Sequence, residues 1–204
     1  MPCKVKIMIG HDDIIHEEIL QAALRLYRKY GPTKVTMDNL AKATGRSRSA
    51  LYYYFKNRDE IFQAVLERIP VDIAAEIRVA VADAANLNDK IYAFCLIKIN
   101  TSYSWKMVFS AMEQVMSADE ISRHGKFIDA MHKKLMYLER GILTEILSAN
   151  GHRISGSAEQ DMLAFIISSG VRGIRREIYE HNDPHDAKAA VQLLSDMVTK
   201  FLQL

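Results

Sequence analysis

Apolar residues recur at helical spacing along most of the chain, and this periodicity constrains the fold more than any other feature of the sequence. In the first such segment, apolar residues follow one another at intervals of three or four positions: Ile15, Ile19, Ala22 and Leu26. This spacing places them on one face of a helix. No long segment alternates apolar and polar residues with the period of two that a half-buried strand shows. The sequence therefore predicts an all-α fold.

Two short helices are predicted next to each other near the N-terminus. Thr36 can cap a helix over residues 37–44, and Ser47 can cap another over residues 48–55, since both hydroxyls can accept a hydrogen bond from the first helical turn. The turn between the two helices, Gly45-Arg46-Ser47, has the length found in helix-turn-helix motifs. Short helical pairs also occur in ordinary α-helical bundles, so this motif alone does not identify a function.

The other expected helices are longer, and glycine, proline and capping residues mark their ends. A first helix ends at Gly31-Pro32, and Asn57 opens a fourth helix that Pro70 is expected to kink or interrupt. Further helices are expected over about residues 88–103, 105–117, 121–150, 158–181 and 185–203, which gives about nine in total. We therefore expect an N-terminal helix-turn-helix domain of three helices over residues 1–66, ordered from about residue 12. A larger helical domain is expected over residues 67–204.

Positive charge is concentrated around the two short helices. The whole chain carries a net charge of only +2, but residues 34–58 contain six lysines and arginines against one acid, Asp38, a local net charge of +5. Charge clustered in this way indicates an anionic partner for the N-terminal part of the chain. A solvated basic surface would give the same count, so charge alone leaves both interpretations open.

The second short helix has an apolar face and a polar face. At about 100° per residue, Leu51 and Phe55 point to one side, and the opposite side carries Ser49, Tyr52, Tyr53 and Lys56. Lysine and arginine neutralise DNA phosphates, hydroxyl groups donate to phosphate oxygens, and arginine can bind a guanine edge through two hydrogen bonds. The polar face therefore favours DNA contact over the alternative, a surface helix whose tyrosines are half buried against neighbouring side chains.

Residues 36–62, TMDNLAKATGRSRSALYYYFKNRDEIF, resemble the DNA-binding signature of the tetracycline-repressor (TetR) family of bacterial transcriptional regulators. The resemblance extends over about residues 12–66. It implies that ten residues contact DNA: Thr36, Arg46, Ser47, Arg48, Ser49, Tyr52, Tyr53, Tyr54, Lys56 and Arg58. Within this set we expect Arg48 to read a base directly. Tyr54 stands where family members often have histidine, and the helical wheel turns it toward the core.

The resemblance also implies a homodimer and a small-molecule effector. An apolar stripe on the last helix and small residues on the helix before it favour a four-helix interface between subunits, formed by Ser169, Gly170, Gly173, Val191, Leu194, Met197, Val198 and Phe201. Methionine and aromatic side chains can fill irregular space around a varied apolar ligand. The expected pocket residues are Tyr103, Trp105, Phe109, Met112, Met131 and Phe165. Both sets would equally suit the protein's own core.

Enzyme signatures are absent from the sequence. It contains no glycine-rich phosphate loop, no Gly-x-Ser-x-Gly elbow and no His-Glu-x-x-His motif, so we expect no catalytic residue, cofactor or metal. Two cysteines and the lack of a membrane-length apolar run predict a cytoplasmic protein without a membrane partner. The expected function is a ligand-responsive repressor that binds a palindromic double-stranded operator as a dimer, although the sequence leaves an activator equally open. The alternative is a helical small-molecule-binding protein, or an enzyme of unknown type, without DNA regulation.

Overall fold

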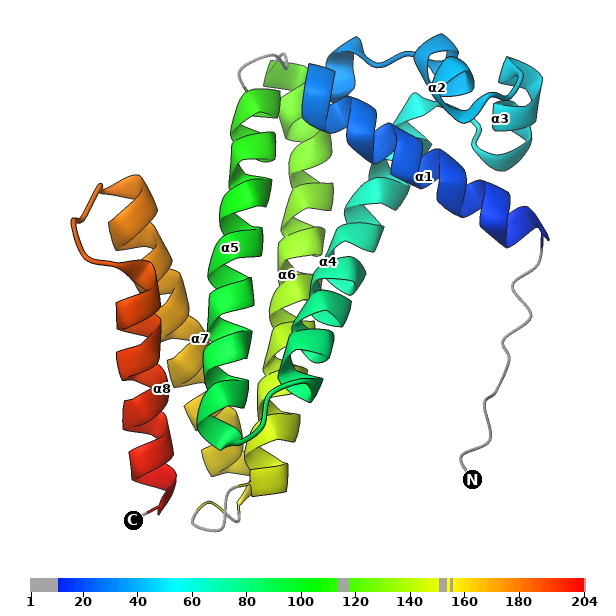
Figure 1. The fold of residues 1–204 in the computed structure, drawn as a ribbon. Helices are drawn as coiled ribbons and strands as arrows, with labels where there is room; N and C mark the ends of the chain where they lie inside the picture. The colour runs from blue at the N-terminus through cyan, green and yellow to red at the C-terminus, as the bar shows by residue number, and fades with distance from the viewer. Residues whose placement is uncertain (1–10, 114–117, 151–153, 155, 204) are drawn as a thin grey trace. The chain divides into compact units, whose positions relative to one another are not determined.

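The computed structural model describes residues 11–113, 118–150, 154 and 156–203, and it describes the side chains of residues 12–101, 125–149, 154 and 156–203. Within these residues every regular element is a helix, and there is no strand (Figure 1). The elements are α1 (His11–Tyr30), η1 (Pro32–Lys34), α2 (Met37–Thr44), α3 (Arg48–Tyr54), α4 (Arg58–Ala82), α5 (Leu87–Glu113), α6 (Ala118–Asn150), α7 (Ser157–Glu180) and α8 (Ala187–Gln203). The prediction of an all-α fold is confirmed.

Two of the expected helix ends do not occur. The prediction of about nine helices divided α5 near Ser104, but α5 continues from Leu87 to Glu113, because a serine inside a helix costs only about 0.5 kcal/mol relative to alanine. The last helix begins at Ala187 rather than at residue 185. Its cap is Asp186, whose carboxylate accepts a hydrogen bond of 2.9 Å from the backbone N–H of Ala189.

Pro70 lies inside α4, which continues through it. Proline removes one backbone hydrogen bond from a helix, but the residues around it anchor both halves in the apolar interior. Ile69 and Ile73 are 2% and 4% exposed. The interruption that we considered from the sequence therefore does not occur.

Contacts within the chain divide it into two compact units. The first comprises Met1–Glu67 and Val108–His124, and the second comprises Arg68–Met107 and Gly125–Leu204. We describe each unit by itself. The division of function between residues 1–66 and residues 67–204 remains a prediction. Within the described residues, no helix combines the length and the hydrophobicity that crossing a bilayer requires.

The core of the first unit is formed on one face of α1. Ile15, Ile19 and Ala22, which the sequence periodicity placed on that face, are buried, and α1 packs against α2. α2 in turn packs against α3, whose Leu51 is fully buried. Each fully buried aliphatic side chain contributes about 1.5–3 kcal/mol relative to an exposed one. The core therefore holds the two short helices in place, and their outer faces carry the polar side chains.

The second unit is a bundle of α7, α8, the C-terminal part of α4, α5 up to Met107 and α6 from Gly125 (Figure 1). Its interior is mostly apolar and includes Ile77, Phe94, Leu143 and Ile167. Polar contacts join neighbouring helices at its surface. In one of them, the side-chain amide of Asn88 on α5 donates to Asp196 on α8 at 2.7 Å.

Two charged side chains are buried inside this bundle. Lys98 on α5 and Glu139 on α6 form an ion pair, and their side chains are only 5% and 3% exposed. Because removing a charge from water is costly, such a pair is stable only while both partners are present. The pair therefore couples α5 to α6.

Candidate nucleic-acid interface

Local capping interactions define both ends of α2. The hydroxyl of Thr36 accepts from the backbone N–H of Asn39 at 3.2 Å, and the Asn39 side-chain oxygen accepts from the backbone N–H of Thr36 at 2.9 Å. This reciprocal arrangement satisfies two backbone donors. Gly45 ends the helix with φ 65°, a left-handed conformation that glycine adopts without steric cost. The turn to α3 is therefore encoded locally.

α3 presents its polar face outward. Ser47 caps it by accepting from the backbone N–H of Ala50 at 3.1 Å. Leu51 is buried on the inner side, whereas Tyr52 and Tyr53 are 45% and 76% exposed on the outer side. These exposures agree with the two faces that the helical wheel assigned. Both tyrosine side chains are thus exposed to an external partner.

Tyr54 faces the protein instead. Its hydroxyl donates to the Asp12 carboxylate on α1 at 3.0 Å. Partial burial, followed by the hydrogen bond and the negative charge of Asp12, raises the pKa of Tyr54 above its ordinary value. Tyr54 therefore joins α3 to α1, as the inward turn of the helical wheel suggested.

Two arginines of the predicted set are engaged within the first unit. Arg46 forms an ion pair of 2.6 Å with Glu18 on α1, and its Nε is buried without a hydrogen-bond partner among the described residues. Arg58 donates from Nη1 to the backbone carbonyl of Thr33 at 2.9 Å, which joins the start of α4 to η1. The side chains of Arg46 and Arg58 are only 29% and 34% exposed. Both therefore act as internal supports in this structure.

Arg48 is more exposed and has a different partner. Its Nε lies 3.3 Å from one oxygen of Asp38 on α2, and its Nη1 lies 3.5 Å from the other oxygen. The arginine side chain is 56% exposed and the aspartate side chain 57%. A hydrogen bond with the Tyr52 hydroxyl, together with the charge of Asp38, raises the pKa of Arg48. The guanidinium is therefore held at the start of α3 with half of its surface accessible.

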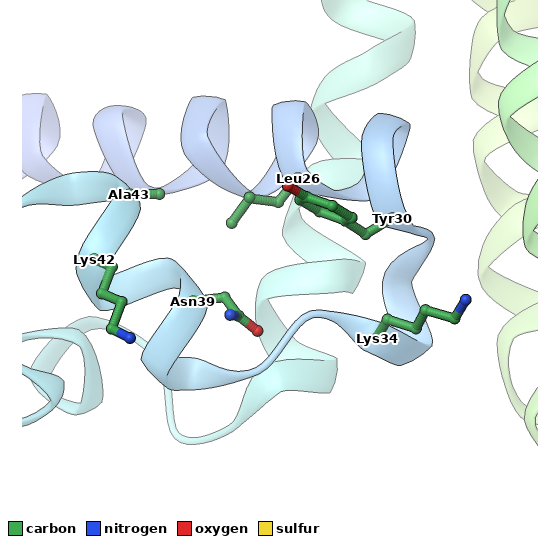
Figure 2. Close-up of a pocket in the computed structure, with 6 residues that line it drawn as sticks. All are labelled: Leu26, Tyr30, Lys34, Asn39, Lys42 and Ala43. Atoms are coloured by element: carbon green, nitrogen blue, oxygen red, sulfur yellow. The ribbon is translucent and has the colours of Figure 1, made fainter.

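Three lysines of this unit have no such partner. The side chains of Lys34, Lys42 and Lys56 are exposed, and none forms an ion pair with a carboxylate in the described part of the chain. Lys34 and Lys42 border an open groove of about 420 Å³ between α1 and α2 (Figure 2). The groove is also lined by Leu26, Tyr30, Asn39 and Ala43. Lys34 and Lys42 were counted in the cluster of positive charge but were absent from the predicted contact set, which followed the family motif.

The predicted pocket residues are only partly described. The side chains of Tyr103, Trp105, Phe109 and Met112 lie outside the described residues. Met131 is buried, at 4% exposed. Phe165 is 50% exposed on α7, so its ring does not line an enclosed cavity in this unit.

The predicted dimer residues divide into buried and exposed positions. Val191 and Val198 on α8 are buried within the unit, because this side of α8 faces its own core. Gly170 on α7 faces Leu194 on α8, since a Cβ at Gly170 would lie 3.6 Å from Leu194 Cδ2. These four residues pack within the chain. Of the remaining four, Met197 and Phe201 are exposed, and Ser169 and Gly173 are partly exposed. Among the described residues, and apart from its chain neighbours and its own helix backbone, no atom lies within 4 Å of a Cβ built on Gly173.

Comparison with known proteins explains this arrangement of helices. Residues 19–65 match the family of bacterial regulatory proteins described as the tetR family. This N-terminal part of the chain is thus similar to the TetR family. The helices α2 and α3 both lie within the residues that match this family of regulatory proteins.

Individual TetR-family relatives are distant in sequence. The chain is 32% identical over 90 residues to an uncharacterized HTH-type transcriptional regulator of Mycobacterium tuberculosis, and the match covers 44% of this chain and 43% of that protein. The chain thus spans less than half the length of the first curated relatives it matches.

Two solved structures show the same fold over most of the chain. The TetR family repressor AlkX from Dietzia sp. strain DQ12-45-1b, implicated in biodegradation of n-alkanes, has a TM-score of 0.55 at 21% identity and covers 92% of this chain and 95% of its own. The transcriptional regulator FadR from Bacillus subtilis, solved in complex with stearoyl-CoA, has a TM-score of 0.55 at 14% identity and covers 89% and 96%. The fold of the second unit is therefore also that of TetR-family proteins.

Proposed function

We propose that this protein is a DNA-binding transcriptional regulator in which α3 enters the major groove of a duplex operator. The observation that carries the proposal is the outer face of α3, which presents Arg48, Tyr52 and Tyr53 beside unpaired lysines in a TetR-family module. The start of α3 also carries the exposed side chains of Ser47 and Ser49, which can donate to phosphates. A regulator of this kind acts on chromosomal DNA, so we place it in the cytoplasm.

The contacts within the unit suggest a division of roles among its cations. Lys34, Lys42 and Lys56 are exposed and can neutralise phosphates on either side of the DNA major groove. Arg48 is placed to read a base edge. Thr36 remains a predicted phosphate contact, although its hydroxyl accepts from the Asn39 backbone and donates to the Asn39 side chain in this structure. Arg46, Arg58 and Tyr54 support the module from within, because each is held by a partner on α1 or η1.

Arg48 and Lys56 offer a direct test of this division. Arg48→Ala is expected to lower discrimination at one base position of each half-site by about 1–3 kcal/mol, or roughly 5- to 150-fold, if the contact is bidentate. Lys56→Ala is expected to weaken binding to all sequences about equally. It should also reduce the slope of log affinity against log salt concentration by about one per subunit. Fluorescence anisotropy on an operator and its single-base variants measures both. Identical profiles for the two variants would contradict the assignment.

We also propose that the regulator binds a palindromic operator as a homodimer through α7 and α8. The two helices pack against each other, and both expose apolar side chains. On α8, Leu193, Met197 and Phe201 recur every four residues and are 62%, 61% and 45% exposed. On α7, Met162, Phe165 and Ile166 are at least half exposed. An exposed apolar surface of this kind is typical of an interaction site. We therefore assign Phe165 to the proposed dimer surface rather than to the effector pocket.

A charge at the centre of this surface is expected to separate the subunits. Met197→Glu would bury an unpaired carboxylate at a cost of several kcal/mol, so the dimer should dissociate at least about 100-fold more readily. The matched control is Gln203→Glu, which adds the same charge at an exposed position on another side of α8. Sedimentation analysis reports the oligomeric state of both. A Met197→Glu protein that remained as dimeric as the control would place the interface elsewhere.

We further propose that a small, largely apolar effector binds within residues 70–180 and releases the operator. Met131, whose buried side chain the structure describes, is one proposed contact with this effector. The other predicted contacts are Tyr103, Trp105, Phe109 and Met112. FadR, which has a similar fold, was solved in complex with stearoyl-CoA, whose acyl chain is apolar although its coenzyme A group is charged. An effector releases DNA only if it binds the arrangement that cannot bind DNA more tightly. Trp105 is the single tryptophan, so quenching of its fluorescence identifies ligands whose effect on operator affinity can be measured.

A further inference from the structure

Asp38 is an unexpected residue for a surface that binds DNA. It is the one acid among residues 34–58, and it lies in the first turn of α2 with its side chain 57% exposed. A carboxylate close to DNA phosphates lowers affinity through repulsion between like charges. The ion pair itself offers little compensation, because an exposed pair contributes little to stability. The contact of Asp38 with Arg48 points instead to a role of this carboxylate in DNA recognition.

The contacts of Asp38 constrain Arg48. Both carboxylate oxygens face the guanidinium, at 3.3 Å from Nε and 3.5 Å from Nη1. A guanidinium has five N–H donors in a fixed planar arrangement, so these two contacts orient the group and leave donors for a further acceptor. Without Asp38, the long side chain could reach a phosphate as readily as a base edge. With Asp38 in place, the guanidinium is already neutralised and gains less from a phosphate.

We infer that Asp38 is the positioning residue that makes Arg48 selective for a base edge over the phosphate backbone. This inference rests on the proposed DNA-binding function. The base edge that fits the remaining donors is guanine, which presents O6 and N7 as paired acceptors in the major groove. Asp38 thereby lowers affinity for DNA in general and raises the ratio of operator affinity to non-specific affinity.

Removal of the carboxylate has two separable consequences. Asp38→Ala is expected to strengthen binding to non-specific duplex and to steepen its salt dependence by about one per subunit, because a repulsive charge is removed and Arg48 becomes free to pair with a phosphate. The same variant is expected to lose about tenfold of the discrimination at the base position that Arg48 reads. Asp38→Glu retains the charge and is expected to retain most of that discrimination.

The experiment uses the full-length protein and a duplex that the wild type selects from a randomised pool. Affinities for this duplex, for each of its single-base variants and for an unrelated duplex are measured at several salt concentrations, and the proteins are compared at equal salt. The proteins compared are wild type, Asp38→Ala, Asp38→Glu, Arg48→Ala and the double variant Asp38→Ala/Arg48→Ala. A matched control is Glu18→Ala, which removes another exposed acid that is paired with an arginine, Arg46. Thermal unfolding shows whether each variant is folded.

The inference is supported if Asp38→Ala loses discrimination at the same base position as Arg48→Ala, gains affinity for the unrelated duplex, and has no further effect on discrimination once Arg48 is alanine. Glu18→Ala should leave discrimination at that position unchanged. Full discrimination by Asp38→Ala overturns the inference, as does a double variant that loses more discrimination than Arg48→Ala alone. A wild-type protein that selects no sequence would remove the proposed function itself, which is a distinguishable outcome.

Discussion

The affinity of the dimer for its operator is expected to fall about 10³- to 10⁴-fold when the salt concentration rises from 50 to 200 mM. Each phosphate neutralised by a lysine or arginine releases condensed counterions, and added salt opposes that release. The three unpaired lysines of each subunit, Lys34, Lys42 and Lys56, give about six neutralised phosphates per dimer. The slope of log affinity against log salt should then be about −5, and steeper if arginines also release their acid partners.

A titration of affinity against salt measures this slope directly. The double variant Lys34→Ala/Lys42→Ala should make the slope shallower by about two per subunit, because two phosphate contacts are lost. Lys188→Ala is the matched control, since Lys188 is an exposed lysine on α8 in the second unit. An affinity that did not change with salt would contradict the assignment of these lysines to phosphates.

The second large effect is expected in the second unit, at the buried pair of Lys98 and Glu139. Glu139→Ala should lower the free energy of unfolding by about 3–5 kcal/mol, because it leaves the Lys98 ammonium buried without a partner. Glu145→Ala is the matched control. Glu145 pairs with Arg78 at 2.9 Å, but its side chain is 60% exposed, so its loss should cost less than about 1 kcal/mol. Urea unfolding of both variants measures the difference, and equal losses would contradict the buried-pair interpretation.

The pH dependence of a Glu139→Gln variant gives an independent test of the same pair. Burial already lowers the pKa of Lys98 below its ordinary value of 10.5, against the opposing effect of Glu139. Removing the Glu139 charge lowers this pKa further. The unfolded chain then binds more protons than the folded one between the lowered pKa and 10.5, so the stability of the variant should rise with pH in that window. A stability deficit relative to wild type that stayed constant with pH would contradict this expectation.

The features that the sequence predicted well depend on local interactions. The capping residues Thr36 and Ser47 and the turn residue Gly45 act within a few positions along the chain, and all three act as expected. The two faces of α3 follow from helical geometry, and the exposures of Leu51 and Tyr53 agree with them. Where local signals were ambiguous, as at the serine within α5, the expected helix end was wrong.

The partners of the charged residues could not be read from the sequence, because they lie far apart along the chain. Arg46 pairs with Glu18, 28 positions earlier, and Lys98 pairs with Glu139, 41 positions later. Sequence reasoning therefore placed Arg46 among the DNA contacts together with Arg48. The packed structure distinguishes the two, since only Arg48 retains more than half of its side-chain surface exposed.

Selection of duplexes from a randomised pool by the purified full-length protein tests the DNA-binding role most directly. The pool should become enriched in an inverted repeat, because each subunit presents one α3 and a two-fold dimer reads two half-sites in successive major grooves, about 34–36 Å apart. Enrichment should fall sharply when the selection is repeated at 200 mM salt rather than 50 mM, the interval over which about 10³-fold of affinity is lost. A pool that remained random after repeated rounds at low salt would contradict the assignment of this protein as a sequence-specific regulator.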